Sequence, residues 1–362
     1  MKSRRAAAEL TVMLCAAALI PATASASPPE CQRDKRSIET SAQQRDNDLL
    51  RWRVRWSGGN CRIDLVATGE LRFNNEFTDI TAISSDGTLD LVDVDGSTTR
   101  RLAMRSDRSN NLVRTYYVND REQPWDDAGK RWLASLLIGL DRMSGIGIDY
   151  RFPTLLAAGG PLAVLDESEK MESDYARSLY LGRLVDRERL NDAEYQRVLD
   201  IASREMRSDY ETSRVLRGVA DHVSFNNDAV RVSYLAAVSR MSSDYERSRC
   251  LQAVFAKSSV SHEMARGAVR AASDFSSDYE RSRVLLAALE SKAISGDDFI
   301  PVIETTMRSR SDYEKSRVLR AVAEKGAMSS DARKAYLRAA DTIRSDYENR
   351  RVLSALVKQE TR

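Results

Sequence analysis

Two spacings of hydrophobic residues divide the chain into two regions. From Leu50 to about Val118, apolar and polar residues alternate at period two, beginning with Trp52, Val54 and Trp56 between arginines. The apolar side continues through Cys61, Ile63, Leu65, Ala67, Gly69, Leu71 and Phe73. Such alternation predicts strands with one buried face. After residue 145, apolar residues recur at intervals of three and four, which is typical of helices packed on a core.

Turn residues separate the predicted strands of the first region. Clusters rich in Gly, Ser, Asp and Asn occur at residues 57–60, 85–87 and 95–96. They bound further strands at residues 88–94, 99–105 and 111–118. We expect an antiparallel meander of six or seven strands with one polar face.

A helix is expected to cover the apolar face of this meander. Residues 126–143 place Trp132, Leu133, Leu136, Leu137 and Leu140 at helical spacing. We therefore assign residues 50–145 to a small antiparallel β-domain with its covering helix. Residues 27–49 are expected to be an N-terminal linker. Residues 146–172 read as a divergent leading helix pair, which Gly159, Gly160 and Pro161 divide.

A nine-residue phrase, SDYERSRVL at Ser277, then occurs six times in all, with small changes. Its first residues are Ser173, Ser208, Ser243, Ser277, Ser311 and Ser345. These serines lie 35, 35, 34, 34 and 34 positions apart. Self-similarity at such a period is typical of a stacked repeat array. We assign residues 173–362 to an α-solenoid of five full repeats and a terminal helix, which makes the fold class α+β.

The phrase is predicted to start the first helix of each repeat. Ser-Asp-Tyr-Glu fits a capping box, in which the Ser hydroxyl and the Glu carboxylate each accept from the other residue's amide. A Leu stands eight residues after each serine: Leu181, Leu216, Leu251, Leu285, Leu319 and Leu353. Together with the apolar position three residues later, it forms the predicted core stripe.

A second helix is predicted to complete each repeat. An apolar residue seventeen positions after the serine is followed by a residue suited to capping: Asn191, Asn226, Ser261, Ser295 or Ser329. A two-helix hairpin cannot bury its apolar side alone, so the copies must stack.

The Tyr and Arg of the phrase form the candidate partner-binding surface. On a helical wheel they lie away from the Leu stripe, as does the Glu of the phrase. We call the following eight residues the Tyr/Arg strip: Tyr210, Tyr245, Tyr279, Tyr313, Arg214, Arg249, Arg283 and Arg317. One interpretation is contact between repeats, with an Arg from a neighbouring copy stacked on each ring. The other is recognition, because Tyr and Arg are common anchors of interfaces. A residue present in every copy favours the first interpretation.

The N-terminus carries the pattern of an export signal. Residues 1–26 combine a basic start, a short apolar run and a small-residue cleavage site. We expect an exported, periplasmic or extracellular protein with no membrane span in the mature chain. Loss of this segment removes Lys2, Arg4, Arg5 and Glu9, which reduces 56 basic and 54 acidic side chains to 53 of each. A mature chain without net charge and without a basic cluster is not expected to bind nucleic acid.

Cysteine usage fits an oxidising compartment. Cys31 and Cys61 flank the start of the first folded region, and we predict that they form a disulfide. Cys250 stands where other copies of the phrase have Val, so it is predicted to be a small buried hydrophobic residue.

Candidate catalytic chemistry is sparse in the sequence. The chain has two histidines, His222 and His262, and no plausible nucleophile, base and acid set can be assembled around them. The stretch from His262 begins like the zinc motif H-E-x-x-H, but Arg266 occupies the position of the second histidine. We expect no enzyme activity, cofactor or metal. A hydrolase site in the β-domain stays an alternative, and it would need a deep pocket lined by perturbed carboxylates at the β/helix junction.

The repeated phrase, with Trp132-Leu133 and Gly159-Gly160, resembles a group of uncharacterised bacterial exported proteins. Their similar repeats also occur beside membrane metallopeptidase domains of the antibiotic-sensor type. The hairpin length resembles HEAT and tetratricopeptide solenoids, without the tetratricopeptide signature residues. This resemblance implies a solenoid and no established activity. We expect a scaffold that binds a protein or peptide in the cell envelope. The alternative is a sensor or regulatory ectodomain that partners a separate envelope enzyme.

Overall fold

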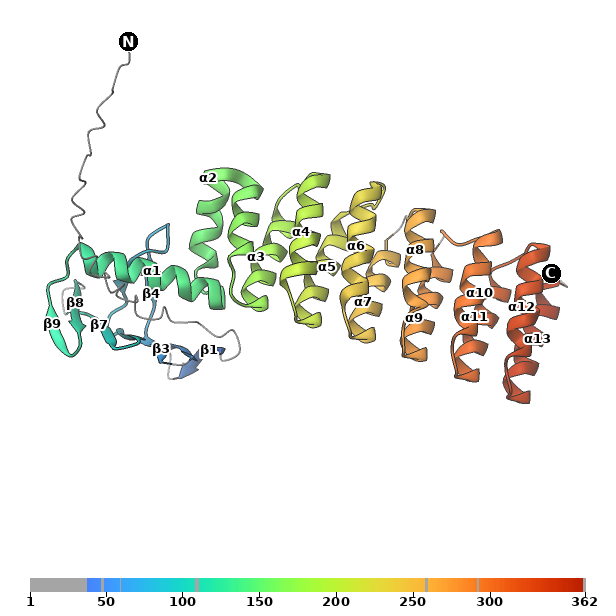
Figure 1. The fold of residues 1–362 in the computed structure, drawn as a ribbon, viewed down its shortest axis with the longest axis horizontal. Coiled ribbons are helices and arrows are strands. Elements are labelled where there is room, and N and C mark those ends of the chain that lie inside the picture. Colours follow the sequence, from blue (N-terminus) through green and yellow to red (C-terminus); the bar gives the residue numbers. More distant parts are fainter. Residues whose placement is uncertain are drawn as a thin grey trace, which may run out of the picture.

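The computed structural model describes residues 38–46, 49–58, 60–107, 111–257, 260–291 and 293–360. Within these ranges an antiparallel β-domain precedes thirteen α-helices that pack in neighbouring pairs, which confirms the predicted α+β class. Figure 1 shows the β-domain at one end of an extended row of helices. The predicted export signal lies outside the described residues. None of the helices described is both long and apolar enough to cross a membrane.

The main sheet is an antiparallel meander of seven strands. Its spatial order is β1 (Ile38–Asp46), β2 (Leu49–Gly58), β3 (Cys61–Thr68), β6 (Thr88–Asp95), β7 (Thr98–Ser106), β8 (Leu112–Val118) and β9 (Arg121–Gln123). The strand β1 lies in the segment predicted to be a linker, and it pairs with β2 along its length. Its sequence, IETSAQQRD, has almost no apolar residues, so no alternation marks it as a strand.

A two-stranded excursion interrupts the alternating run after Thr68. The strands β4 (Leu71–Phe73) and β5 (Ile80–Ile83) pair with each other instead of extending the main sheet. The chain turns at Gly69, whose φ of 82° is the left-handed conformation that glycine adopts without strain. Leu71 and Phe73 remain buried, so the period-two pattern continues through the turn and conceals it.

The covering helix α1 (Asp127–Ser144) packs on the apolar face of the sheet. Leu133, Leu137 and Leu140 are almost fully buried against strand residues such as Ile63 and Leu91. The helix begins at the N-cap Asp126, whose side chain accepts from two backbone amides. The predicted cover of the sheet is therefore present.

The helix pair that leads into the solenoid is labelled α2 (Ile148–Glu169). Its backbone leaves helical geometry at Gly159 and Gly160, where the sequence predicts a break. Both halves pack on the solenoid core through Phe152, Val164 and Leu165.

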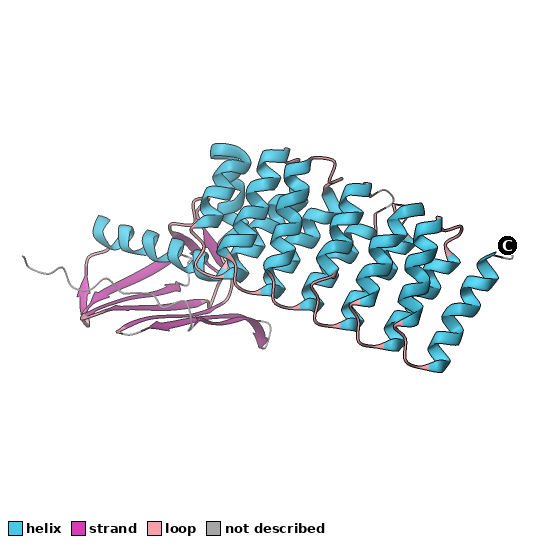
Figure 2. Cartoon of the chain, turned by 45° about the vertical axis from the view of Figure 1, so that its right-hand side comes forward, coloured by secondary structure: helices cyan, strands magenta, loops and turns pink. Residues whose placement is uncertain are grey.

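The solenoid has two layers, which Figure 2 shows as parallel rows of helices. The first helices of the copies are α3 (Asp174–Arg187), α5 (Asp209–His222), α7 (Asp244–Phe255), α9 (Asp278–Glu290), α11 (Asp312–Glu324) and α13 (Asp346–Glu360). The second helices are α4 (Asp192–Glu205), α6 (Asp228–Arg240), α8 (His262–Ala272), α10 (Phe299–Met307) and α12 (Ser330–Asp341). Each first helix packs against the first helix of the next copy, and each second helix does the same within its layer.

The predicted helix starts and core stripe are present. Each serine of the phrase directly precedes its helix, and its hydroxyl accepts from the amide three residues later. The phrase leucines are fully buried in the first five copies, whereas Leu353 on the last helix is partly exposed. The last helix has no following helix in the described chain to cover that side.

Two of the predicted second-helix caps are wrong. Asn227, not Asn226, caps α6, because the left-handed backbone at Phe225 (φ 58°) shifts the helix start by one residue. Ser295 makes no side-chain cap. It precedes the short 3₁₀ helix η1 (Gly296–Asp298), after which α10 begins. Asn191, Ser261 and Ser329 cap their helices as predicted.

Candidate partner-binding strip

The Asp that follows each phrase serine connects its copy to the next one. Asp174, Asp209, Asp244, Asp278 and Asp312 each accept from two consecutive backbone amides at the start of the next phrase. For Asp244 these are the amides of Ser276 and Ser277, at 2.6 and 2.8 Å. The carboxylate therefore occupies the position at which a capping box would place the Glu of the next phrase.

In three copies the Glu of the phrase accepts a hydrogen bond from a Ser of the preceding copy. Glu211 accepts from Ser178 at 2.5 Å, Glu314 accepts from Ser282 at 2.5 Å, and Ser248 donates to Glu280. These carboxylates are more than 90% buried, so the expectation that they face away from the core is wrong. The return bond of the predicted capping box is absent in these copies. We call the Asp and Glu bonds between copies the inter-repeat seam.

A buried cation closes four of the six copies, at a position with no role predicted from the sequence. Four residues after the serine stand Arg177, Arg247, Arg281 and Lys315, which are all less than 9% exposed. Arg281 donates to Asp278 at 2.6 Å, to Ser309 at 3.1 Å and to the carbonyl of Phe275. Lys315 donates to the carbonyl of Thr342 at the end of α12. Cations are favourable at helix C-termini because carbonyl groups and the helix dipole meet there. Their recurrence at one position in the phrase was the available signal.

The tyrosines of the phrase, in contrast, are exposed. Tyr210, Tyr245, Tyr279 and Tyr313 are 51–55% exposed, and Tyr175 and Tyr347 continue the row at its two ends. They lie one residue into their helices, and the starts of these helices follow one long edge of the array in Figure 2. About half of each tyrosine faces solvent, so burial between repeats alone does not explain why every copy has one.

Each strip arginine donates to the Glu of its own helix, and Arg214 and Arg283 also donate to Ser178 and Gln252 of the preceding copy, at 3.5 and 3.2 Å. Arg214 and Arg317 donate to the Glu three residues earlier at 2.8 Å, and Arg249 and Arg283 do so at 3.5 and 3.3 Å. The guanidinium carbons of Arg249, Arg283 and Arg317 lie 5.5–5.8 Å from the ring centres of the Tyr four residues earlier. The expected stacking of an Arg from a neighbouring copy is therefore wrong. The Tyr and Arg of one helix form a preformed pair.

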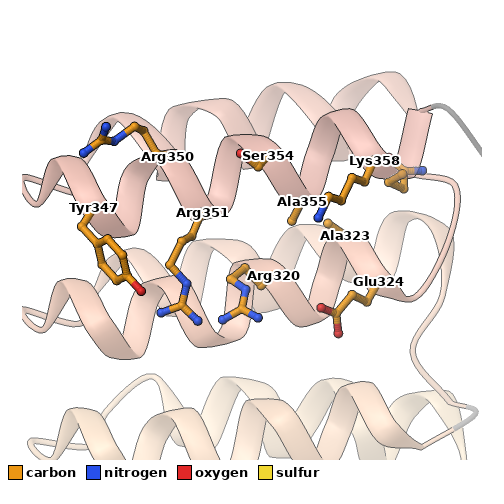
Figure 3. A pocket seen from close by; sticks show the side chains of 10 residues that line it. Arg320, Ala323, Glu324, Tyr347, Arg350, Arg351, Ser354, Ala355 and Lys358 are labelled. Carbon is orange, nitrogen blue, oxygen red and sulfur yellow. The ribbon is translucent and has the colours of Figure 1, made fainter.

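A surface groove lies where the strip reaches the last two first helices. It has a volume of about 570 Å³ and runs between α11 and α13. Figure 3 shows the Tyr347 ring and the guanidinium groups of Arg351 and Arg320 in a row along it, with Glu324 at the far end. Ala323 and Ala355 lie on its floor and leave room between the helices.

A buried polar network joins the β-domain helix to the solenoid. Arg151 donates to Asp141 at 2.7 Å and to Glu167 at 2.8 Å, and Tyr180 donates to Asp141 at 2.6 Å. Burial raises the pKa of Asp141, although its hydrogen bonds to Tyr180 and Arg151 oppose the rise. Burial would also raise the pKa of Glu167, but Arg142 and Arg151 outweigh it and hold that pKa below its ordinary value.

The network bears on the alternative of a hydrolase site at this junction. Its two carboxylates are perturbed, yet both are engaged by arginine and nearly inaccessible. They line neither the groove of Figure 3 nor a second hollow of about 630 Å³ beside Tyr116 and Arg121. The arrangement is well suited to fixing α1, α2 and α3 together.

The two residues that would begin and end the incomplete zinc motif contact a carboxylate of the next copy. His262 and Arg266 both contact the buried Asp298 on the next copy, at 3.0 and 2.6 Å. Arg266 thus carries an ion pair at the position where a second metal ligand would stand. Within the described ranges, no group of three or more His, Cys, Asp or Glu residues could hold a metal ion.

The structure describes Cys61 and Cys250 but not Cys31. Cys31 lies outside the described residues, so its disulfide with Cys61 stays a prediction. Cys61 is buried at the start of β3. Cys250 is free and fully buried, which agrees with its interpretation as a small core residue. Burial raises the pKa of its thiol to about 12.

No protein-family model, curated protein or solved structure that was compared with the chain matches it. The resemblance to exported repeat proteins therefore rests on the phrase and its accompanying motifs.

Proposed function

We propose that this protein is a non-enzymatic, exported scaffold that binds a protein or peptide along the Tyr/Arg strip. The observation that carries the proposal is the exposure of the strip tyrosines. Eleven large hydrophobic side chains are exposed among the residues with described burial, and six of them are the phrase tyrosines. Exposed aromatic residues that gather on one surface are typical of interaction sites.

The inter-repeat seam supports this proposal by removing the competing explanation. Stacking of the copies is accounted for by the apolar stripe and by the Asp, Glu and Ser bonds between them. A tyrosine about half exposed adds little to that contact. Its repetition in all six copies then needs another reason, and a ligand that spans several copies supplies one.

Selection from a random peptide phage library tests the proposal. The triple variant Tyr245→Ala, Tyr279→Ala, Tyr313→Ala removes three adjacent rings, and Val232→Ala with Leu337→Ala removes two exposed apolar side chains from the second layer as a control. We expect selected peptides to bind the wild type and the control equally. The triple variant should bind them at least about tenfold more weakly, with an unchanged melting temperature.

Two outcomes would contradict the proposal. Equal binding of the selected peptides by the triple variant would place their site elsewhere on the molecule. A markedly lower melting temperature of the triple variant would show that the rings stabilise the array. In that case the repetition of Tyr would have a structural cause.

A further inference from the structure

The distance between successive strip tyrosines sets the repeat length of a ligand that contacts each of them. Each copy contributes one exposed Tyr, which an Arg four residues later accompanies from the second copy onward, and the first helices of successive copies pack directly side by side. Packed helices lie about 8–10 Å apart. A ligand that makes the same contact with every copy must therefore repeat with a period of about 8–10 Å.

This length distinguishes the regular conformations of a peptide. An α-helix repeats every ~5.4 Å along its axis. A β-strand returns a side chain to the same face every ~7 Å. A polyproline II helix has three residues per turn and rises ~3.1 Å per residue, so it repeats every ~9 Å. Only the last of these periods fits one contact per copy over several copies.

The chemistry of the strip fits the same conformation. A polyproline II backbone makes no internal hydrogen bonds, so its carbonyl groups need external donors, and proline itself offers no N–H. The strip supplies flat aromatic surfaces for the proline rings and guanidinium donors beside them. The hydrogen bonds of Arg249 and Arg317 to protein groups use Nη1, which leaves Nε and Nη2 to donate to a ligand.

The charge of the strip argues against an acidic peptide. Every strip arginine is paired with a buried glutamate of its own helix. A carboxylate on the ligand would meet a cation whose charge is already balanced nearby. A neutral acceptor such as a backbone carbonyl does not need an unbalanced cation.

We infer that the Tyr/Arg strip binds a proline-rich polypeptide in the polyproline II conformation, with one turn of the peptide on each copy. The inference rests on the proposed binding function and names its ligand class. Tyr175 and Tyr347 extend the four strip tyrosines to six rungs, one for each copy. A fully engaged peptide would therefore have about eighteen residues, at three per rung.

Synthetic peptides of known length test the inference. Fluorescence anisotropy would measure the binding of labelled Pro-Pro-Gln repeats of about 6, 12, 18 and 24 residues, with Gly-Ser-Gln repeats of the same lengths as controls. We expect the Kd to fall at least about tenfold between 6 and 18 residues and then to level off, because further turns meet no rung. The triple tyrosine variant should lose at least about tenfold in affinity for the 18-residue peptide, while Val232→Ala with Leu337→Ala should not.

The outcomes separate this inference from the proposed function. If Pro-Pro-Gln and Gly-Ser-Gln repeats bind equally, the polyproline II inference is overturned. Should phage-selected peptides then still require the strip tyrosines, the proposed function stands with another peptide class as ligand. Pro-Pro-Glu repeats that bind much more tightly than Pro-Pro-Gln, in a salt-sensitive way, would overturn the inference in favour of an acidic ligand.

Discussion

The inter-repeat seam and the Tyr/Arg strip come from the same nine-residue phrase and repeat with the same period, but they differ in burial. The seam glutamates are buried, the seam aspartates are partly buried, and both bond to the neighbouring copy. The strip tyrosines are about half exposed, and their arginine partners belong to the same helix. The comparison shows that a residue present in every copy need not serve the stacking of copies. The exposure of the side chain distinguishes the two roles.

The sharpest test of this comparison uses two arginines on one helix. Arg281 is buried with three partners, and Arg283, two residues later, belongs to the strip. We expect Arg281→Met to lower the free energy of unfolding by about 3 kcal/mol, because it removes a buried guanidinium and leaves the buried hydroxyl of Ser309 and the carbonyl of Phe275 without their donor. Arg283→Met should cost about 1 kcal/mol, because the Arg283 side chain is partly exposed and Glu280 keeps its hydrogen bond from Ser248.

Urea denaturation followed by circular dichroism measures both arginine variants. Solenoids can unfold in parts, so the whole transition should be compared as well as its midpoint. Equal losses from the two substitutions would remove the distinction between seam and strip.

A second test uses the pH dependence of the seam. Burial would raise the pKa of Asp278, but the amides of Ser311 and Arg310 and the charge of Arg281 outweigh it and lower that pKa. Because the folded-state pKa lies below the unfolded value, the carboxylate stabilises the fold above pH ~4, and this contribution is lost as the pH falls through the folded-state pKa. Asp278→Asn should therefore cost about 1–2 kcal/mol near pH 7 and progressively less below pH 4.

The control for the pH test is the exposed Asp228→Asn, which removes a carboxylate that has no bond to another copy. Thermal unfolding of both variants and the wild type would be followed from pH 7 to pH 3. A wild-type advantage over Asp278→Asn that grows on acidification would show that the sign is wrong.

The smallest expected effect concerns the free cysteine in the hydrophobic core of the solenoid. Cys250 is fully buried, and burial raises its pKa to about 12. We expect no alkylation of Cys250 by iodoacetamide at pH 8 in the native protein and rapid alkylation in urea, because the thiolate is the reactive form. Peptide mass spectrometry identifies the labelled cysteine. Labelling of the native protein at the rate seen in urea would show that the array opens between copies.

The sequence predicts those features of the fold that depend on local spacing. The repeat array, the serine caps and the Leu stripe are all confirmed. The caps and the stripe follow from neighbours on one helix, and the repeat is read directly from the spacing of the serines. Spacing along one helix gives the wrong partner for the phrase Glu. Its predicted partner is the Ser amide of the same phrase, whereas its observed partner lies 32 or 33 residues away in the preceding copy. Such a partner depends on the distance and rotation between helices, which spacing along one helix does not give.

Other differences have equally physical causes. The strand β1 is polar and becomes a strand by pairing with β2, so composition does not reveal it. The left-handed Phe225 displaces one helix cap. For the candidate site, the sequence places the Tyr and Arg on one face of each helix. It does not show that the rings are open or that the guanidinium groups are already occupied, because both depend on how the copies stack.

The bonds of the inter-repeat seam have a fixed sense along the chain. Each Asp reaches forward to the copy that follows, and the bonded Glu residues reach backward to the copy before. The copy that contains Asp278 and Glu280 bonds to both of its neighbours in this way, and interior units of this kind are interchangeable in principle. Duplication or loss of one whole unit would lengthen or shorten the binding surface without redesigning a single joint. The architecture thus gives evolution a simple way to match the reach of the array to the span of its ligand.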